Sequence, residues 1–230
     1  VYWHSETGGK DRQYHLQKLL AAQNAGVTLY MLWEDDWNQR QLQWKQSIAH
    51  KLGVSPRGDR VYARSCTVQR LQKDAAADFL KKHNVQRTVP ATSALGLYDK
   101  EGLLVAVATF KRTANEDYLN QYTTSRHVVG GLGKLARAGK RDGVPLVSFA
   151  DLCNSRGEAH IAAGFVKDGE VPPDYTYTTG HTRVHKLEYN LKRFLTDRNL
   201  TFEKGMTAAQ LAKLNNLHRI WDCGKIRFVL

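Results

Sequence analysis

The order of apolar segments between residues 90 and 180 constrains the fold of this chain more than any other feature. Short apolar runs rich in strand formers alternate there with helical spacing and turn residues. In chain order the predicted elements are strands at 95–98, 103–110 and 118–124, a glycine-rich turn at 128–134 opening a helix to about 138, a strand at 144–151, a helix at 155–163 and a strand at 175–179. Strands and helices in this alternation predict an α/β domain.

Residues 1–53 form a second, smaller pattern. Residues 1–5 are interpreted as a strand end, a helix follows from Asp11 to Gly26, residues 27–33 are a short apolar run, and a second helix covers about 37–52. This predicts one strand–helix–strand–helix unit, and two strands seldom form a stable sheet alone. Turn formers and arginines follow, so the predicted domains are 1–70 and 71–230.

The remaining segments of the second domain carry weaker signals. A helix is predicted at 73–82, and a basic stretch covers 183–198. Thr207 with Gln210 has the spacing of a capping box, which predicts the start of a last helix. The segment 221–228 is predicted to be a final strand.

The chain carries 34 Lys and Arg residues against 22 Asp and Glu, a formal net charge of +12. Residues 1–70 contribute 10 basic and 6 acidic side chains, so both predicted domains are basic. This excess favours a polyanionic partner, with nucleic acid first and an anionic membrane second. A soluble basic protein with scattered charge is the alternative.

Cysteine usage and hydropathy indicate the compartment. Cys66, Cys153 and Cys223 lie far apart, and their odd number argues against a disulfide framework. Reduced thiols in a cytosolic compartment are expected. No apolar run in the sequence approaches the roughly 18 residues that a membrane span needs.

Three polar motifs stand in order near the start of the chain. They are Trp3-His4-Ser5-Glu6, then Asp11-Arg-Gln-Tyr14-His15-Leu16-Gln-Lys18, then Glu34-Asp35-Asp36-Trp37. In this order and spacing they resemble the very-short-patch repair endonuclease and the phage homing endonucleases of the EDxHD type. The resemblance implies a partial restriction-endonuclease-like α/β unit in a phage-encoded protein that acts in the cytoplasm of the bacterial host.

The nuclease resemblance implies metal-dependent phosphodiester hydrolysis on double-stranded DNA, with Mg²⁺ neutralising the scissile phosphate. By resemblance the catalytic residues are His4, Asp11, His15 and Glu34, and the metal ligands are Glu34 and Asp35. Histidine titrates near neutral pH and suits proton transfer. The alternatives are a structural histidine beside Trp3 and carboxylates that complement a helix dipole.

One departure from the nuclease pattern is serious. In that family the principal metal-binding aspartate lies on a strand upstream of the Trp-His segment, and here only Val1 and Tyr2 precede Trp3. We therefore expect a fragment of a longer product, or an inactive nuclease, that cuts DNA poorly as it stands.

The second domain resembles the GNAT acetyltransferase core, and among DNA-modification proteins those of the Mom-like type. The resemblance is carried by the strand order, by the turn before the helix at 131–138 and by Gly164-Phe165 after a helix. A domain of this kind also resembles the one that follows the nuclease in the phage homing group, with the same Asp222-Cys223-Gly224 near the carboxyl end. The GNAT resemblance implies a GNAT-like mixed-sheet α/β domain whose turn offers N–H groups to a pyrophosphate of acetyl-CoA. The cofactor-binding candidates are Gly130, Gly131, Gly133 and Lys134.

Acyl-CoA chemistry does not follow from a glycine-rich turn alone. Tight packing of helix on sheet, or contact with a DNA phosphate, explains the same residues. Asp151 and His160 are further acid–base candidates, with a helix cap as the plainer role of Asp151.

The leading hypothesis from sequence is a site-specific homing-type DNA endonuclease. The alternatives are a DNA-modifying acyltransferase of GNAT or Mom-like type and a DNA-binding module without activity. In each case basic side chains are expected to contact the DNA. The candidates are Arg57, Arg60, Arg64, Lys134, Arg137, Lys140 and Arg141.

Overall fold

The computed structural model describes residues 1–54 and 60–230, which group into two compact units. Unit 1 comprises Val1–Gln39, Leu152–Asn154 and Val171–Lys225. Unit 2 comprises Arg40–Asp151, Ser155–Glu170 and Ile226–Leu230. The units are interleaved along the chain, unlike the predicted domains 1–70 and 71–230: residues 40–70 group with unit 2 and residues 171–225 with unit 1.

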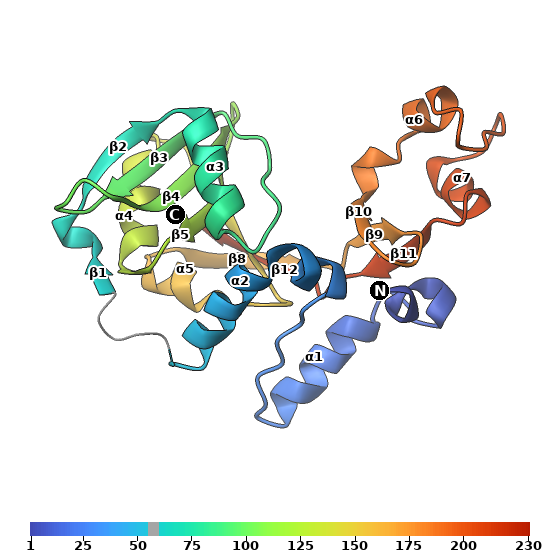
Figure 1. Ribbon diagram of the computed structural model, residues 1–230, viewed down its shortest axis with the longest axis horizontal. Coiled ribbons are helices and arrows are strands. Elements are labelled where there is room, and N and C mark those ends of the chain that lie inside the picture. Colours follow the sequence, from blue (N-terminus) through green and yellow to red (C-terminus); the bar gives the residue numbers. More distant parts are fainter. Residues whose placement is uncertain (55–59) are drawn as a thin grey trace. The chain divides into compact units, whose positions relative to one another are not determined.

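A seven-stranded mixed sheet organises unit 2 (Figure 1). Its strands, in spatial order, are β2 (Thr67–Leu71), β3 (Ser93–Tyr98), β4 (Leu104–Arg112), β5 (Asp117–Thr124), β7 (Leu146–Asp151), β12 (Lys225–Val229) and β8 (Val166–Val171). The strands predicted at 95–98, 103–110, 118–124 and 144–151 are confirmed. This is a mixed-sheet α/β architecture, as the sequence predicts.

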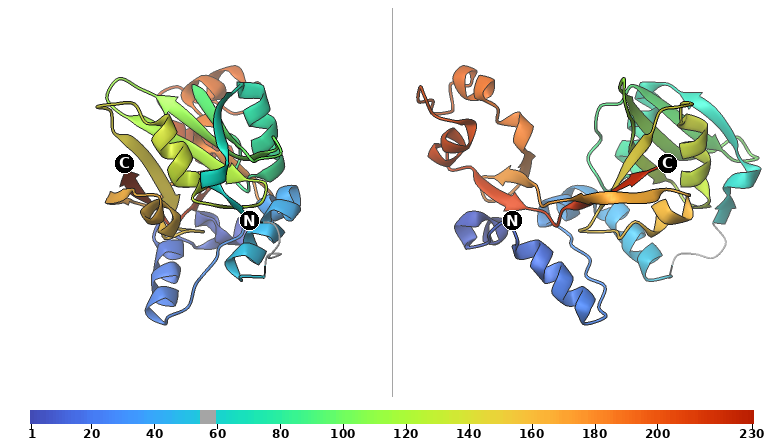
Figure 2. Two further views of the ribbon diagram at one scale, coloured as in Figure 1. Left: turned by 90° about the vertical axis from the view of Figure 1, so that its left-hand side faces the viewer. Right: turned by 180° about the vertical axis from the view of Figure 1, so that it is seen from behind.

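Helices cover both faces of this sheet (Figures 1 and 2). Helix α3 (Lys73–His83) packs on the face that presents Val107. Helix α4 (Gly131–Gly139) packs on the opposite face, where Gly139 lies against the ring of Phe110. Side chains of one strand alternate between faces, so the fully buried Val107 and Phe110 anchor two separate layers.

Strands β5 and β7 form the one parallel pair described within the large sheet, and they pair only briefly. Their register joins Asp117 to Leu146 and Tyr118 to Val147. Just beyond these pairs the Ser148 hydroxyl donates to the carbonyl of Leu119, at 3.4 Å. The two strands separate from there toward their carboxyl ends, which leaves room at one edge of the sheet.

Short elements complete unit 2. Strand β1 (Arg60–Tyr62) pairs in parallel with β6 (His127–Val129), and η4 (Ala63–Ser65) follows β1. Helix α5 (Glu158–Ala162) follows β7. Helix α2 (Glu34–Lys51) changes course at Arg40, where φ is −138°, and its residues from Arg40 onward belong to unit 2.

Unit 1 holds a three-stranded antiparallel sheet of β10 (Arg183–His185), β9 (Tyr175–Thr178) and β11 (His218–Trp221). Its helical elements are η1 (Tyr2–His4), η2 (Glu6–Gly8), α1 (Tyr14–Asn24), η5 (Lys186–Glu188), α6 (Leu191–Thr196) and α7 (Ala208–Leu214). Tyr177, Phe194 and Leu211 form the core between sheet and helices. The capping box predicted at Thr207 and Gln210 is confirmed at the start of α7.

The strands expected at residues 1–5 and 27–33 are not formed, so that prediction is wrong. Residues 2–4 form η1, and residues 27–33 have neither helix nor strand structure. Leu29 and Met31 instead pack against Leu19, Cys153 and Cys223. A lone extended segment cannot satisfy its backbone groups as a sheet does. The Met31 amide instead donates to the Cys153 carbonyl, at 3.0 Å.

Candidate functional site

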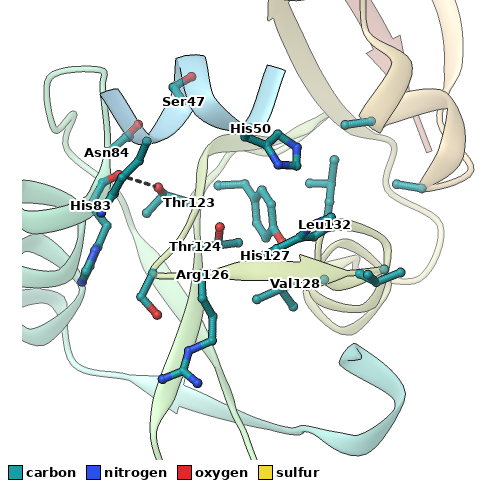
Figure 3. A pocket seen from close by; sticks show the side chains of 18 of the residues that line it. Ser47, His50, His83, Asn84, Thr123, Thr124, Arg126, His127, Val128 and Leu132 are labelled. Atoms are coloured by element: carbon teal, nitrogen blue, oxygen red, sulfur yellow. Dashed lines mark hydrogen bonds between the residues drawn. The ribbon is translucent and has the colours of Figure 1, made fainter. Parts of the chain in front are cut away.

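A cavity of about 810 Å³ lies within unit 2, at the carboxyl end of β5. Its walls come from the second half of α2, the end of α3, the segment from β5 through β6 to the first turn of α4, and α5. Figure 3 shows His50 reaching from α2 toward His127 and Leu132. The cavity therefore lies beyond the carboxyl end of β5, past the last described pair of β5 with β7.

The first turn of α4 forms one end of this cavity. Gly130 precedes the helix with a left-handed φ of 76°, a conformation that glycine adopts without strain. The amide of Leu132 hydrogen-bonds the phenol oxygen of Tyr122. Among the described residues, no acceptor is present for the N–H groups of Gly131 and Gly133. Helix amides at this position can bind an anion.

Close packing accounts for part of the glycine pattern. A Cβ on Gly131 would lie 2.3 Å from the Tyr122 hydroxyl, and one on Gly133 would lie 3.3 Å from backbone atoms of Ala163. Burial raises the pKa of the Tyr122 phenol far above its usual value, so the hydroxyl remains protonated. The packing explanation thus holds for Gly131, while Gly130 has open space around it, with only the Ala63 side chain within 4 Å of an added Cβ.

Two basic residues of α4 behave differently. Lys134 donates to the carbonyls of Ala63 and Cys66, at 2.9 and 2.6 Å, so its ammonium stabilises the turn after β1. Arg137 lines the cavity beside the small side chains of α5 and donates to the Ala163 carbonyl. Of the two, Arg137 is the cation placed at the cavity wall.

The opposite side of the cavity is polar. His50 and His127 meet edge to face, with ring centroids 4.9 Å apart. Burial lowers the pKa of His127, and the nearby His50 and Arg60 lower it further. Asn84 is 6% exposed, its side-chain oxygen accepts from Gln86, and its amide nitrogen has no partner among the described residues.

The predicted nuclease residues lie in unit 1, where two of them meet. His4 Nδ1 lies 3.1 Å from His15 Nε2, and both rings contact Trp33. Burial, together with the charge of His4, lowers the pKa of His15 to about 4, so His15 is neutral at pH 7. The pair was predicted as one site from sequence, and the geometry brings it together.

The acidic residues predicted beside these histidines are otherwise engaged. Asp35 is buried and accepts from the backbone and guanidinium of Arg183, which also pairs with Asp36. Asp11 accepts from the amide of Gln13, and the Glu34 carboxylate is 71% exposed at the start of α2. Across residues 1–54 and 60–230, no three His, Cys, Asp or Glu side chains gather as metal ligands.

The predicted DNA-contacting residues are scattered. Arg57 lies outside the described residues. Arg60 and Lys140 are exposed, and Arg64 stacks over the ring of Tyr62. Arg141 forms two hydrogen bonds with the fully buried Asp117, so its charge stabilises the sheet.

Sequence reasoning missed the polar side of the cavity. The second half of α2 was assigned to the predicted nuclease domain, yet Gln43 donates to the carbonyls of Lys81 and Lys82 at the end of α3. Asn84 and Tyr122 carried no motif. The adjacent His83 and Asn84, directly after a helix end, were the one local hint of a polar site.

Comparisons with known proteins give distant structural likenesses alone. No protein-family model and no curated protein matches the chain. The structure is similar to the crystal structure of spermidine/spermine N-acetyltransferase SpeG from Vibrio cholerae in complex with manganese ions. The TM-score is 0.38 and the identity 10%, over 73% of this chain and 93% of the other.

The prediction of a homing endonuclease is wrong. The strands that should carry the nuclease site are not formed. Asp35 and Asp36 pair with Arg183, so the predicted Mg²⁺ site has no support in the described residues. Nor does any described helix combine the length and apolar character needed to cross a bilayer.

Proposed function

We propose that unit 2 is an acyltransferase that uses an acyl-CoA such as acetyl-CoA. The observation that carries the proposal is a helix start with unoccupied amides that opens on a cavity of about 810 Å³ at the carboxyl end of β5. Ligands of open α/β sheets commonly bind at the carboxyl ends of strands. When bound, acyl-CoA supplies an activated thioester whose acyl group passes to a nucleophile.

The residues present fit such a cofactor. The N–H groups of Gly131 and Gly133 would receive phosphate oxygens at the positive end of the α4 dipole. Arg137 adds a cation at the same wall, and the small side chains of Ala159 and Ala162 line the cavity beside it. Among the described residues, none that lines the cavity is an Asp or Glu that would repel phosphate.

The described side chains also limit proton transfer at the start of α4. The Tyr122 hydroxyl fixes the start of α4 by accepting from Leu132, and its raised pKa keeps it from acting as a base near neutral pH.

A matched pair of substitutions tests the cofactor site. Gly130→Asp and Gly130→Asn have nearly the same shape, and Asp and Asn both tolerate the left-handed φ of Gly130. Isothermal titration calorimetry with acetyl-CoA should show Gly130→Asn within about threefold of the unmodified chain and Gly130→Asp weaker by more than about tenfold, because only Asp repels phosphate. Equal affinity for both variants, or no binding to the unmodified chain, contradicts the proposal.

A DNA-binding module without activity is the second candidate, because charge concentrates in unit 2. Unit 2 has 22 Lys and Arg residues against 12 Asp and Glu, whereas unit 1 has 12 against 10. Salt-sensitive binding of double-stranded DNA, in a chain that does not bind acetyl-CoA, would favour this candidate over acyl transfer.

A further inference from the structure

The cavity of unit 2 has two chemically different sides. The side formed by α4 and α5 presents backbone amides, alanines and Arg137. The side formed by α2, α3 and β5 is polar and carries histidine, amide and hydroxyl groups. These are Gln43, Gln46, Ser47, His50, His83, Asn84, Thr123, Thr124, Ser125, Arg126 and His127.

The polar side lacks the feature that a cationic substrate needs. A positively charged amine held in a cavity is ordinarily paired with carboxylates, since burying an unpaired charge is costly. The described lining contains Arg126 and Arg137 and no Asp or Glu. The unit around it carries an excess of ten positive charges. Both the lining and the surrounding field favour an anion.

Asn84 gives the second, independent observation. It lines the cavity at 6% exposure, and its side-chain oxygen already accepts a hydrogen bond from the backbone N–H of Gln86. Its amide nitrogen is a buried donor without an acceptor in the described structure. Buried donors are almost always satisfied in folded proteins, so a ligand that offers an acceptor oxygen or ring nitrogen suits this position. The neighbouring Thr123 hydroxyl, which donates to the His83 carbonyl, holds the end of α3 in place.

We propose that the polar side of this cavity binds the acceptor substrate, and that the acceptor is a nucleotide, either free or as a unit of a nucleic-acid strand, rather than a cationic amine. A nucleotide supplies phosphate charge for the arginines and acceptor atoms on the base for Asn84. The transfer of an acyl group to this nucleotide rests on the proposed acyltransferase function. The binding of the nucleotide to the cavity does not depend on that function.

Binding is measured on the full chain by fluorescence anisotropy with a labelled 12-nucleotide single-stranded DNA. Adenosine monophosphate and 1,4-diaminobutane are added as competitors. We expect the monophosphate to displace the oligonucleotide and the diamine not to do so at equal ionic strength. Displacement by the monophosphate identifies a nucleotide pocket, whereas binding of the strand alone, without such displacement, identifies a site that needs the polymer. Preferential binding of the diamine overturns the proposal.

Matched variants distinguish binding in the cavity from binding to the overall positive charge of unit 2. Asn84→Asp keeps the shape and the acceptor for Gln86 but replaces the unpaired donor with a negative oxygen. Asn115→Asp makes the same change at an exposed position of unit 2 outside the cavity. We expect at least about a tenfold loss of affinity for the first variant and less than about twofold for the second. Equal losses would assign the binding to the field of the whole unit and overturn the cavity site.

A third variant guards against misfolding of Asn84→Asp. His50 lies on the exposed side of the cavity, so His50→Glu introduces a carboxylate with little risk to the core, and His50→Gln controls for loss of the ring. We expect nucleotide affinity to fall for His50→Glu by at least about fivefold relative to His50→Gln. Unchanged affinity in His50→Glu contradicts the proposal. Titration of the same variants with acetyl-CoA distinguishes the two proposals. If a nucleotide binds and acetyl-CoA does not, the acyltransferase proposal is contradicted and the nucleotide site is supported.

Discussion

His160 Nε2 lies 3.0 Å from the hydroxyl of Ser148, at the point where β5 and β7 separate. Its ring stacks on Phe228, and its Nδ1 is buried without a partner among the described residues. Burial lowers the pKa of His160 below the usual value of 6.5. The helix that follows β7 is thus tied to the sheet by a neutral imidazole.

The pair predicts a pH dependence of stability. Because the folded-state pKa lies below the unfolded value, the unfolded chain binds more protons between the two values. The free energy of unfolding should therefore fall as pH decreases through about 6.5. In urea titrations from pH 8 to pH 5, the unmodified chain should lose more stability than His160→Gln. Parallel pH profiles would show that His160 protonates freely in the folded state.

The buried carboxylate of Asp117 predicts a large loss of stability when it is removed. It is fully buried at the start of β5 and accepts from Arg112 at 2.6 Å and from Arg141 at 2.7 Å. Asp117→Ala leaves two guanidinium groups without their partner and should lower the free energy of unfolding by about 3 kcal/mol. Asp142→Ala, at an exposed neighbouring position, should change it by less than about 0.5 kcal/mol. Similar small losses in both variants would refute this account.

Gly139 predicts a packing limit between α4 and the sheet. A Cβ at this position would lie 2.2 Å from the Phe110 ring, which is fully buried. Gly139→Ala should lower the free energy of unfolding by about 1–3 kcal/mol, because the ring or the helix must move. Gly169→Ala in β8 meets nothing within 4 Å and should have little effect. Thermal unfolding of both variants checks this, and a neutral Gly139→Ala would place α4 farther from Phe110.

The Asp35–Arg183 pair predicts that replacing Asp35, which the sequence suggested as a metal ligand, destabilises unit 1. Asp35 is 3% exposed, and Arg183 also stacks over the Trp33 ring at 4.6 Å. Asp35→Ala should destabilise unit 1 by about 3 kcal/mol and shift the tryptophan emission, whereas Glu34→Ala, at an exposed carboxylate, should do neither. An Asp35→Ala chain with unchanged stability would free this carboxylate from a structural role.

Much of the local structure could be predicted from the sequence. Apolar runs and turn residues predicted β3, β4, β5 and β7, and the Thr207–Gln210 spacing predicted the start of α7. The glycines before α4 predicted a helix start that offers free amides. Each of these depends on interactions within a few residues, which a short stretch of sequence contains in full.

The same reasoning failed where the partner lies far along the chain. Residues 27–33 have the composition of a strand, yet no neighbouring strand is placed to pair with them. Asp35 has the position of a metal ligand, but Arg183, 148 residues away, takes its carboxylate. A carboxylate's role depends on which charge meets it, and local pattern does not contain that information.

The sequence by itself determined the strands β3, β4, β5 and β7 of the large sheet, the glycine-bounded start of α4 and the excess of positive charge. Only the tertiary structure decided that this charge gathers in unit 2, that α2 from Arg40 onward walls the cavity, and that the described lining holds no carboxylate. The physical reason is that periodicity and capping act over a few residues, whereas a cavity is made by side chains that only folding brings together.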